Sequence, residues 1–226
     1  MNGKIKSEGK CKYCNKTVTQ QGMGRHLATH LKESELQNPS AALALHLLVK
    51  AGPYFLHLLV PATKNLKNVD TFLRKIWLEC CGHMSDFNVG GRGSQDVDIT
   101  RKCEDVFSST NKLMYRYDMG STTELEIEIK GSYHLAVADI ILLSRNEPLA
   151  LICEACNKEP AVAICIACSY EDVASFCKSC AVAHEKTCKD FADYARMPVV
   201  NSPRMGVCGY EGGTIDVERD GIYKKG

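Results

Sequence analysis

The chain has 226 residues, of which 45% are hydrophobic and 24% are charged, and its formal net charge is +1. This composition is ordinary for a globular protein, and a charge near zero excludes a global electrostatic attraction to nucleic acid or membrane. Thirteen cysteines are present, most of them in Cys-x-x-Cys pairs, which is metal-ligand spacing and not the pattern of a disulfide framework.

Hydrophobic segments are too interrupted to span a membrane. The longest apolar tract, residues 41–62, is broken by Lys50, Gly52, Pro53 and Pro61, whereas a span needs roughly 20 apolar residues. The N-terminus is rich in lysine and lacks the apolar stretch of a secretory signal. We expect no membrane partner and a cytoplasmic location, where thiols stay reduced and available to zinc.

The first predicted element is a two-Cys two-His zinc finger in a domain of residues 1–37. Its predicted zinc ligands are Cys11, Cys14, His26 and His30. Two cysteines on a tight turn and two histidines one helical turn apart can surround one tetrahedral zinc ion. Val18 and Met23 occupy the places where such fingers usually have Phe and Leu, so the finger has only a light core of its own.

The finger is basic, which raises the question of nucleic-acid binding. Residues 1–32 hold seven Lys or Arg against one Glu, a net charge of +6. Counting from the first histidine, the base-contacting positions −1, 3 and 6 fall on Thr19, Gly22 and Arg25, and of these Arg25 suits a guanine edge. The predicted nucleic-acid-binding residues are Arg25, Lys12 and Lys16. A structural or protein-binding finger with a solvated lysine face is the alternative.

A central domain is predicted over residues 38–150. Its expected strands are 54–60, 83–89, 113–117, 123–130 and 137–143, its expected helix is 66–80, and 90–93 is an expected loop. The apolar run that begins at Ala41 can be a buried strand or a short helix, because periodicity does not separate the two. The fold class predicted from these elements is α+β, with a central antiparallel sheet and helices, flanked by small zinc-stabilised modules at both ends.

Part of this domain resembles a known family. The segments HMSDFNV, CEDVF and LMYRYDMGSTTELEIEI, within residues 50–145, resemble the core of the root-inducing-plasmid (pRi) ORF-three-like family, often described as passenger proteins of insertion elements. Members usually have a YDFGD-type turn followed by Trp and His. Here the turn is YDMGS, and Thr122, Thr123 and Leu125 replace the Trp–His stretch. The resemblance implies an α+β fold with no established activity.

No catalytic residue is predicted, because each possible catalytic group in the central domain has a simpler explanation. The alternating glutamates of Glu124–Glu128 match a solvated outer face of a strand. Cys80, Cys81 and His83 could form a thiol–imidazole pair, but free cysteines are mostly buried, and inert core packing is the simpler interpretation. The other histidines of this domain have no neighbour at ligand spacing.

The densest metal-binding pattern is the module predicted over residues 151–190. Its predicted ligands are Cys153, Cys156, Cys165, Cys168, Cys177, Cys180, His184 and Cys188. These four pairs are enough for two zinc ions. In a sequential arrangement, the first and second pairs bind one ion and the third and fourth pairs bind the other. In an interleaved cross-brace, the first pair shares an ion with the third, and the second pair shares an ion with the fourth. Cys180 and Cys188 lie eight residues apart, about 12 Å along a helix that starts near Cys180, which favours the interleaved arrangement.

The spacing of this module is similar to cross-brace modules of the B-box and MYND kind, which mainly bind proteins. Six acids against four lysines between Glu154 and Asp190 argue against a phosphate-binding face. The tail of residues 191–226 is turn-rich, carries the lone Cys208, and is expected to pack back on the core. Three zinc ions are expected in the whole chain. The sequence predicts a non-enzymatic adaptor for a protein partner; the alternative is a nucleic-acid-binding regulator associated with mobile DNA.

Overall fold

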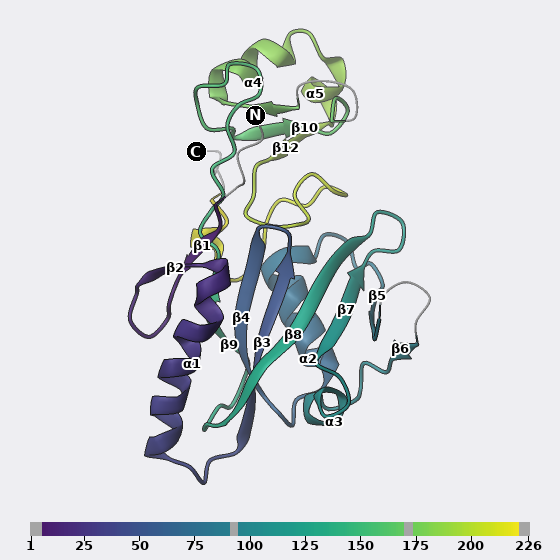
Figure 1. Cartoon of the computed structure of the whole chain (residues 1–226). Coiled ribbons are helices and arrows are strands. Elements are labelled where there is room, and N and C mark those ends of the chain that lie inside the picture. The colour runs from purple at the N-terminus through teal and green to yellow at the C-terminus, as the bar shows by residue number, and fades with distance from the viewer. Residues whose placement is uncertain (1–5, 91–94, 170–173, 222–226) are drawn as a thin grey trace. The chain divides into compact units, whose positions relative to one another are not determined.

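The structure is a computed structural model that describes residues 6–90, 95–169 and 174–221 (Figure 1). The chain forms two compact units: a sheet unit of residues 1–73 and 83–147, and a cross-brace unit of residues 74–82 and 148–226. Cysteine and histidine groups that could form small metal-binding modules lie in both end regions of the chain. The predicted fold class, α+β with an antiparallel central sheet and candidate metal-binding modules at both ends, is confirmed.

A seven-stranded sheet organises the sheet unit. Its strands are β3 (Leu43–Ala51), β4 (Tyr54–Pro61), β5 (Ser85–Asn88), β6 (Asp96–Val97), β7 (Lys112–Tyr117), β8 (Thr123–His134) and β9 (Ile141–Arg145). Their order is β6-β5-β7-β8-β3-β4-β9, and neighbouring strands pair antiparallel. A two-residue turn at Gly52 and Pro53 joins β3 to β4, and Gly52 adopts a φ of 56° that suits glycine.

The apolar run at residues 43–51 is a strand because both of its faces are covered. On one face Ala44 and Leu48 belong to a hydrophobic cluster with the first helix, α1 (Gln20–Gln37). Successive side chains of a strand point to opposite faces, so Leu45 and Leu47, which are also buried, point to the other. Figure 1 shows α2 (Leu66–Leu73) behind the sheet. A strand buried on both sides loses the polar–apolar alternation that would identify it.

Several predicted bounds differ from the structure. The helix expected over 66–80 ends at Leu73, and a π-helical turn, Arg74–Leu78, follows. The strand expected over 137–143 starts only at Ile141, and β8 continues beyond residue 130 to His134. The sheet unit also contains a short helix, α3 (Cys103–Phe107). Gly90 lies in a bend, and the rest of the loop expected at 90–93 lies outside the described residues.

The N-terminal finger is part of the sheet unit. A hairpin of β1 (Glu8–Lys10) and β2 (Thr17–Thr19) leads into α1. The hairpin also lies against the edge strand β9: Gly9 bridges Asn146, and the amide of Lys12 donates to the carbonyl of Leu143 at 2.9 Å. Backbone hydrogen bonds therefore attach the finger to the end of the sheet.

Side chains of α1 complete this attachment. Met23, Leu27 and Leu31 are fully buried in one cluster with residues of the sheet such as Phe55 and Tyr133. The finger, whose own core is light, thus shares the core of the central sheet. The four predicted domain ranges stay predictions, because a shared core does not show which segments fold independently.

The cross-brace unit contains a three-stranded antiparallel sheet and two short helices. Its elements are β10 (Ala163–Cys165), β11 (Ser175–Phe176), α4 (Lys178–Glu185), α5 (Lys189–Asp193), β12 (Arg196–Pro198) and a 3-10 turn, Val217–Arg219. The tail packs on the π-helical turn, where Ser202 Oγ donates to the carbonyl of Trp77 at 2.7 Å and the amide of Thr214 donates to the carbonyl of Lys75 at 2.7 Å. Within the described ranges, every helix is too short or too polar to traverse a bilayer.

We predict that Gly9→Ala destabilises the sheet unit by about 1–3 kcal/mol, because the new Cβ would lie 2.4 Å from the carbonyl oxygen of Arg145. Gly24→Ala on α1 is the matched control: its Cβ would meet the nearest atom, His57 Cε1, at 3.5 Å. A glycine-to-alanine change inside a helix should stabilise by about 0.5–1 kcal/mol. Urea unfolding followed by circular dichroism measures both, and equal effects would contradict the close approach.

Candidate metal centres

The predicted finger ligands come together in one group, the N-terminal cluster. One ligand atom each of Cys11, Cys14, His26 and His30 lies within 4.8 Å of every other. The cysteines lie in the turn between β1 and β2, and the histidines lie one turn apart on α1. Cys11 is buried and the sulfur of Cys14 lies 3.2 Å from His26 Nε2.

The donor atoms of the N-terminal cluster fit a metal ion. His30 Nε2 is buried and has no hydrogen-bond partner, as expected for a nitrogen that binds metal. The other ring nitrogen, Nδ1, lies 3.7 Å from Glu33 Oε2. A carboxylate beside the second nitrogen orients a metal-binding imidazole and increases its basicity. Two thiols and two imidazoles form a donor set typical of zinc.

In two of the Cys-x-x-Cys turns, an asparagine follows the second cysteine. Asn15 follows the second cysteine of the finger, and Asn157 follows the second cysteine of the C-terminal module. Both adopt left-handed backbone conformations, with φ of 58° and 55°. The amide of each asparagine donates to the carbonyl of the first cysteine, Cys11 or Cys153, at 2.9 and 2.8 Å. Asparagine tolerates this conformation better than most residues, so the sequence itself marks these two turns.

The eight predicted C-terminal ligands form two groups. Cluster A contains Cys153, Cys156, Cys177 and Cys180, and cluster B contains Cys165, Cys168, His184 and Cys188. Ligand atoms within each cluster lie within 4.8 Å of one another. The first pair therefore joins the third and the second joins the fourth, which is the interleaved arrangement.

Strand pairing keeps the two clusters apart, and short sulfur–sulfur distances show which pairs belong together. β10 and β11 run antiparallel, with Ala163 opposite Phe176. Cys165 ends β10, whereas Cys177 follows the last residue of β11, so the two cysteines lie at opposite ends of the strand pair. The sulfur of Cys177 lies 3.9 Å from that of Cys156, and the sulfur of Cys188 lies 4.0 Å from that of Cys168. The sequential arrangement would place the two cysteines of each of these pairs on different ions, so it does not fit. Cys188 lies beyond the end of α4, three residues after Glu185, in agreement with its separation from Cys180.

Local hydrogen bonds prepare cluster A for a cation. Hydrogen bonds from the hydroxyl of Ser179 and the amide of Cys180 lower the pKa of Cys177 to about 6. This thiol is therefore largely a thiolate at neutral pH, which is the form that binds metal. Hydrogen bonding to Cys177, burial and the other thiols raise the pKa of Cys180 to about 12. A bound cation would release that proton, because metal binding requires deprotonated thiols.

Aromatic packing fixes the imidazole of cluster B. The ring of Phe176 stacks on His184, with centroids 4.2 Å apart and planes 19° apart. Phe191 contacts the same imidazole edge-on at 4.9 Å. An imidazole held on two sides loses little conformational entropy when it binds a metal ion.

Each of the three predicted clusters provides four protein donors. Four donors complete a tetrahedral zinc site, whereas catalytic zinc sites have three protein ligands and keep one position for water or substrate. The arrangement therefore suits structural metal ions. It offers no position at which a metal-bound water could react.

The three predicted nucleic-acid residues, Lys12, Lys16 and Arg25, are exposed. Arg25 lines an open groove of about 890 Å³ between α1 and the sheet. The same groove is lined by Glu124, Glu126 and Glu128. Lys50 and Lys130 line it too, so positive and negative side chains are equal in number and the groove offers phosphates no excess of positive charge.

The alternating glutamates are less solvated than the sequence analysis predicts. Glu126 and Glu128 are half-buried and form ion pairs with Lys50, at 2.5 and 3.0 Å. Lys112 contacts Glu126 and Lys130 contacts Glu128. Burial alone would raise the pKa of Glu126, but the two lysines lower it to about 2. The Glu126 carboxylate is therefore charged and its ion pairs stabilise the sheet, which argues against acid–base chemistry by this residue at neutral pH.

A buried histidine pair is absent from the sequence-based predictions. His46 Nε2 lies 2.9 Å from His57 Nδ1, and both residues are at most 1% exposed. Burial lowers the pKa of His46 to about 4 and that of His57 to about 3. His46 faces Leu59 and His57 faces Leu48 across the hairpin, so the two imidazoles are diagonal neighbours on one face. The register of the hairpin would have revealed this pair.

The expectation of inert core packing for Cys80 and Cys81 is wrong. Cys80 is half-buried and Cys81 is exposed, and Cys208, expected to be a lone cysteine, lies with its sulfur 3.6 Å from that of Cys81. Cys103 is the one cysteine of the chain outside the four Cys and His groups. Burial raises its pKa to about 12, which makes it inert.

Comparisons with known proteins give no family. No family model matches the chain, and no curated protein matches it. A crystal structure of a protein of unknown function, MM3350 from Methanosarcina mazei Go1, is similar over 46% of this chain and 68% of that chain, with 13% identity and a TM-score of 0.38. A likeness of this size carries no argument, and the resemblance to the ORF-three-like family stays a prediction.

The histidine pair should make the sheet unit acid-sensitive. Both folded-state pKa values lie below the unfolded value of about 6.5, so the unfolded chain binds more protons between about pH 6.5 and 4, and stability falls as pH falls. The double change His46→Gln and His57→Gln should reduce this slope by about 1–3 kcal/mol per pH unit. His134→Gln, at an exposed histidine, is the control. Urea titrations at several pH values measure the slopes, and identical slopes would contradict the prediction.

Proposed function

We propose that this protein is a zinc-binding, non-enzymatic interaction protein that holds a protein partner through its cross-brace unit. The observation that carries the proposal is the set of three closed four-donor clusters, two of them interleaved. Closed sites stabilise small modules whose own cores are too small to fold alone. Such a module provides a rigid surface that a partner can bind, and it has no reactive centre.

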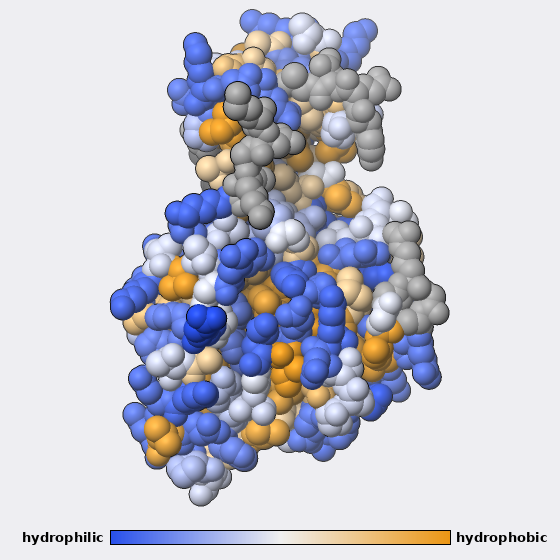
Figure 2. Space-filling model, in the orientation of Figure 1, coloured by the Kyte–Doolittle hydropathy of each residue, from blue (hydrophilic) through white to orange (hydrophobic). Residues whose placement is uncertain are grey.

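Exposed apolar side chains of the cross-brace unit support a protein partner. Val182 on α4 is 51% exposed and Tyr194, directly after α5, is 63% exposed. Aromatic residues on a rigid support are typical anchors of protein interfaces. Figure 2 shows hydrophobic residues at the surface of this unit among hydrophilic ones. Because residues 154–190 are slightly acidic, the expected partner is a segment with apolar side chains flanked by basic ones.

Nucleic-acid binding through the finger is the second candidate function. Its support is the net charge of +6 in residues 1–32 and the exposure of Lys12, Lys16 and Arg25. Phosphate contacts of this kind are independent of sequence and weaken steeply with salt. The groove beside Arg25 has as many carboxylates as positive side chains and so offers no excess of positive charge to phosphates, which favours the protein partner.

Metal analysis tests the zinc assignment. We expect at least three zinc ions per chain, and Cys14→Ser and Cys180→Ser should each remove one ion from a different unit. Trp77 is the only tryptophan of the chain and lies in the cross-brace unit. Its fluorescence should therefore respond to Cys180→Ser and not to Cys14→Ser. Fewer than three ions in wild-type protein purified under reducing conditions would contradict the assignment.

A photo-crosslinking amino acid at position 182 tests the partner surface. It should form an adduct with one protein partner, and the added change Tyr194→Ala should reduce that adduct at least tenfold without loss of zinc, because neither residue is a ligand. The control places the crosslinker at Leu36, which is 82% exposed on α1 in the sheet unit.

Equal adducts at positions 36 and 182 would contradict the proposed surface. Fluorescence anisotropy with DNA and RNA, at low and physiological salt, provides the second arm of this test. Salt-resistant binding that Arg25→Ala abolishes would instead support the nucleic-acid candidate.

A further inference from the structure

A second kind of thiol group lies in the cross-brace unit, outside clusters A and B. The sulfur of Cys81 lies 3.8 Å from that of Cys80 and 3.6 Å from that of Cys208. All three sulfurs lie within 4.8 Å of one another. We propose that Cys80, Cys81 and Cys208, here named the three-thiol cluster, bind a fourth zinc ion.

The sulfur distances match zinc coordination. Two sulfurs bound at about 2.3 Å to a tetrahedral zinc ion lie about 3.8 Å apart. The predicted zinc clusters show the same spacing: the sulfurs of Cys156 and Cys177 lie 3.9 Å apart in cluster A, and those of Cys168 and Cys188 lie 4.0 Å apart in cluster B. A disulfide requires about 2.05 Å, so none of these sulfurs is bonded to another.

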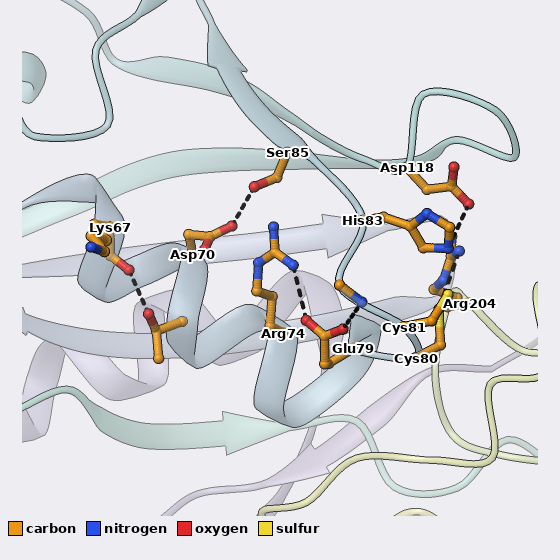
Figure 3. Close-up of polar contacts among 12 residues, drawn as sticks. Lys67, Asp70, Arg74, Glu79, Cys80, Cys81, His83, Ser85, Asp118 and Arg204 are labelled. Carbon is orange, nitrogen blue, oxygen red and sulfur yellow. Dashed lines mark hydrogen bonds and ion pairs between the residues drawn. The ribbon is translucent and has the colours of Figure 1, made fainter.

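The turn that presents Cys80 and Cys81 is held by side chains of its own unit. Glu79 Oε1 accepts a hydrogen bond of 2.6 Å from the amide of Gly82, which has a left-handed φ of 78°. The other carboxylate oxygen, Oε2, accepts from Arg74 Nη1 at 2.9 Å (Figure 3). The two thiols are therefore positioned before any ion binds, which reduces the entropy cost of binding.

The backbone at Cys208 is unusual. Cys208 has a φ of 50°, a conformation that costs an ordinary side chain roughly 1 kcal/mol or more, and it is followed by Gly209 at a φ of 67°. Glycine or asparagine would fit position 208 more easily. A strained, exposed cysteine whose sulfur meets two others is explained by a need for the thiol itself.

Charge balance also favours a cation. Three thiolates and Zn²⁺ carry a net charge of −1. Arg204, which is fully buried, places Nη2 3.6 Å from the sulfur of Cys80 (Figure 3). A guanidinium beside the site offsets the remaining charge and stabilises the thiolate.

A fourth donor follows closely in the chain. His83 is joined to Cys81 through one intervening residue, which keeps its imidazole within reach of an ion bound there. Three thiols and one imidazole form a common structural zinc set. The ion would join residues 80 and 81 to residue 208 and so fasten the tail to the π-helical segment of its own unit.

Zinc content of the full-length chain, purified under reducing conditions, tests this site. We expect four zinc ions in wild-type protein, three in Cys208→Ser and three in Cys81→Ser. Cys103→Ala, which removes the cysteine outside all clusters, should keep four. Three ions in wild type with no further loss in either variant would overturn the proposal, as would a Cys81–Cys208 disulfide found by non-reducing peptide mapping.

Alkylation of the wild-type chain gives a second measurement that needs no variant. The exposed thiols of Cys81 and Cys208 should react with iodoacetamide at least tenfold more slowly with zinc than after chelation. Equal rates would also overturn the proposal. Peptide-level mass spectrometry reports clusters A and B separately, so a failure of the fourth site and a failure of the proposed function are distinguishable.

Discussion

The part of the cross-brace unit around clusters A and B has few large apolar side chains, and the metal–thiolate coordination that we propose there would stabilise it. Its described core cluster contains three alanines and one cysteine beside Phe176 and Phe191. Burial of this size stabilises a module by only a few kcal/mol at most, which does not offset the entropy of ordering its chain. Coordination of Zn²⁺ contributes roughly 10–16 kcal/mol to the folding of small modules. With metal bound, the positions of the ligands would determine where the strands and helices of this part can lie.

The finger also has a small apolar core, but it packs on the central sheet. Its hairpin and helix enclose little apolar area, but Leu27 and Leu31 continue the apolar stripe of α1 onto the central sheet. A metal ion bound by the N-terminal cluster would hold the hairpin to the helix, and the sheet holds the helix in place. A helix packed in this way places the exposed Arg25 at an open groove that carboxylates of the sheet unit also line. Shared packing thus bears on function as well as on stability.

The candidate metal clusters and the lysines and glutamates of the groove share one property: their members already have partners within the chain. The three predicted clusters have four donors each, and the lysines of the groove are matched by half-buried glutamates such as Glu126. Reactive sites usually keep an open metal position or a pKa near the working pH, whereas the pKa of Glu126 is about 2. These features agree with a protein that acts through its surfaces.

The sequence by itself determined the local features of this protein. Ligand spacing predicted twelve donors, which lie together in three groups, and the alternation of Glu124–Glu128 identified β8 and its polar face. These patterns are readable because a Cys-x-x-Cys turn, a helical turn or a strand fixes the distance between residues only a few positions apart. Bounds that depend on packing, such as the end of α2 at Leu73, were not readable in this way.

Tertiary structure alone decided how these local features combine. The interleaved clusters follow from the tertiary contacts that bring Cys156 to Cys177 and Cys168 to Cys188, and the buried His46–His57 pair follows from the register of the β3–β4 hairpin. The sulfurs of Cys81 and Cys208 meet across 127 positions of sequence because the tail packs on the π-helical turn. Distances of that kind are set by long-range packing and strand register, which no short pattern of residues encodes.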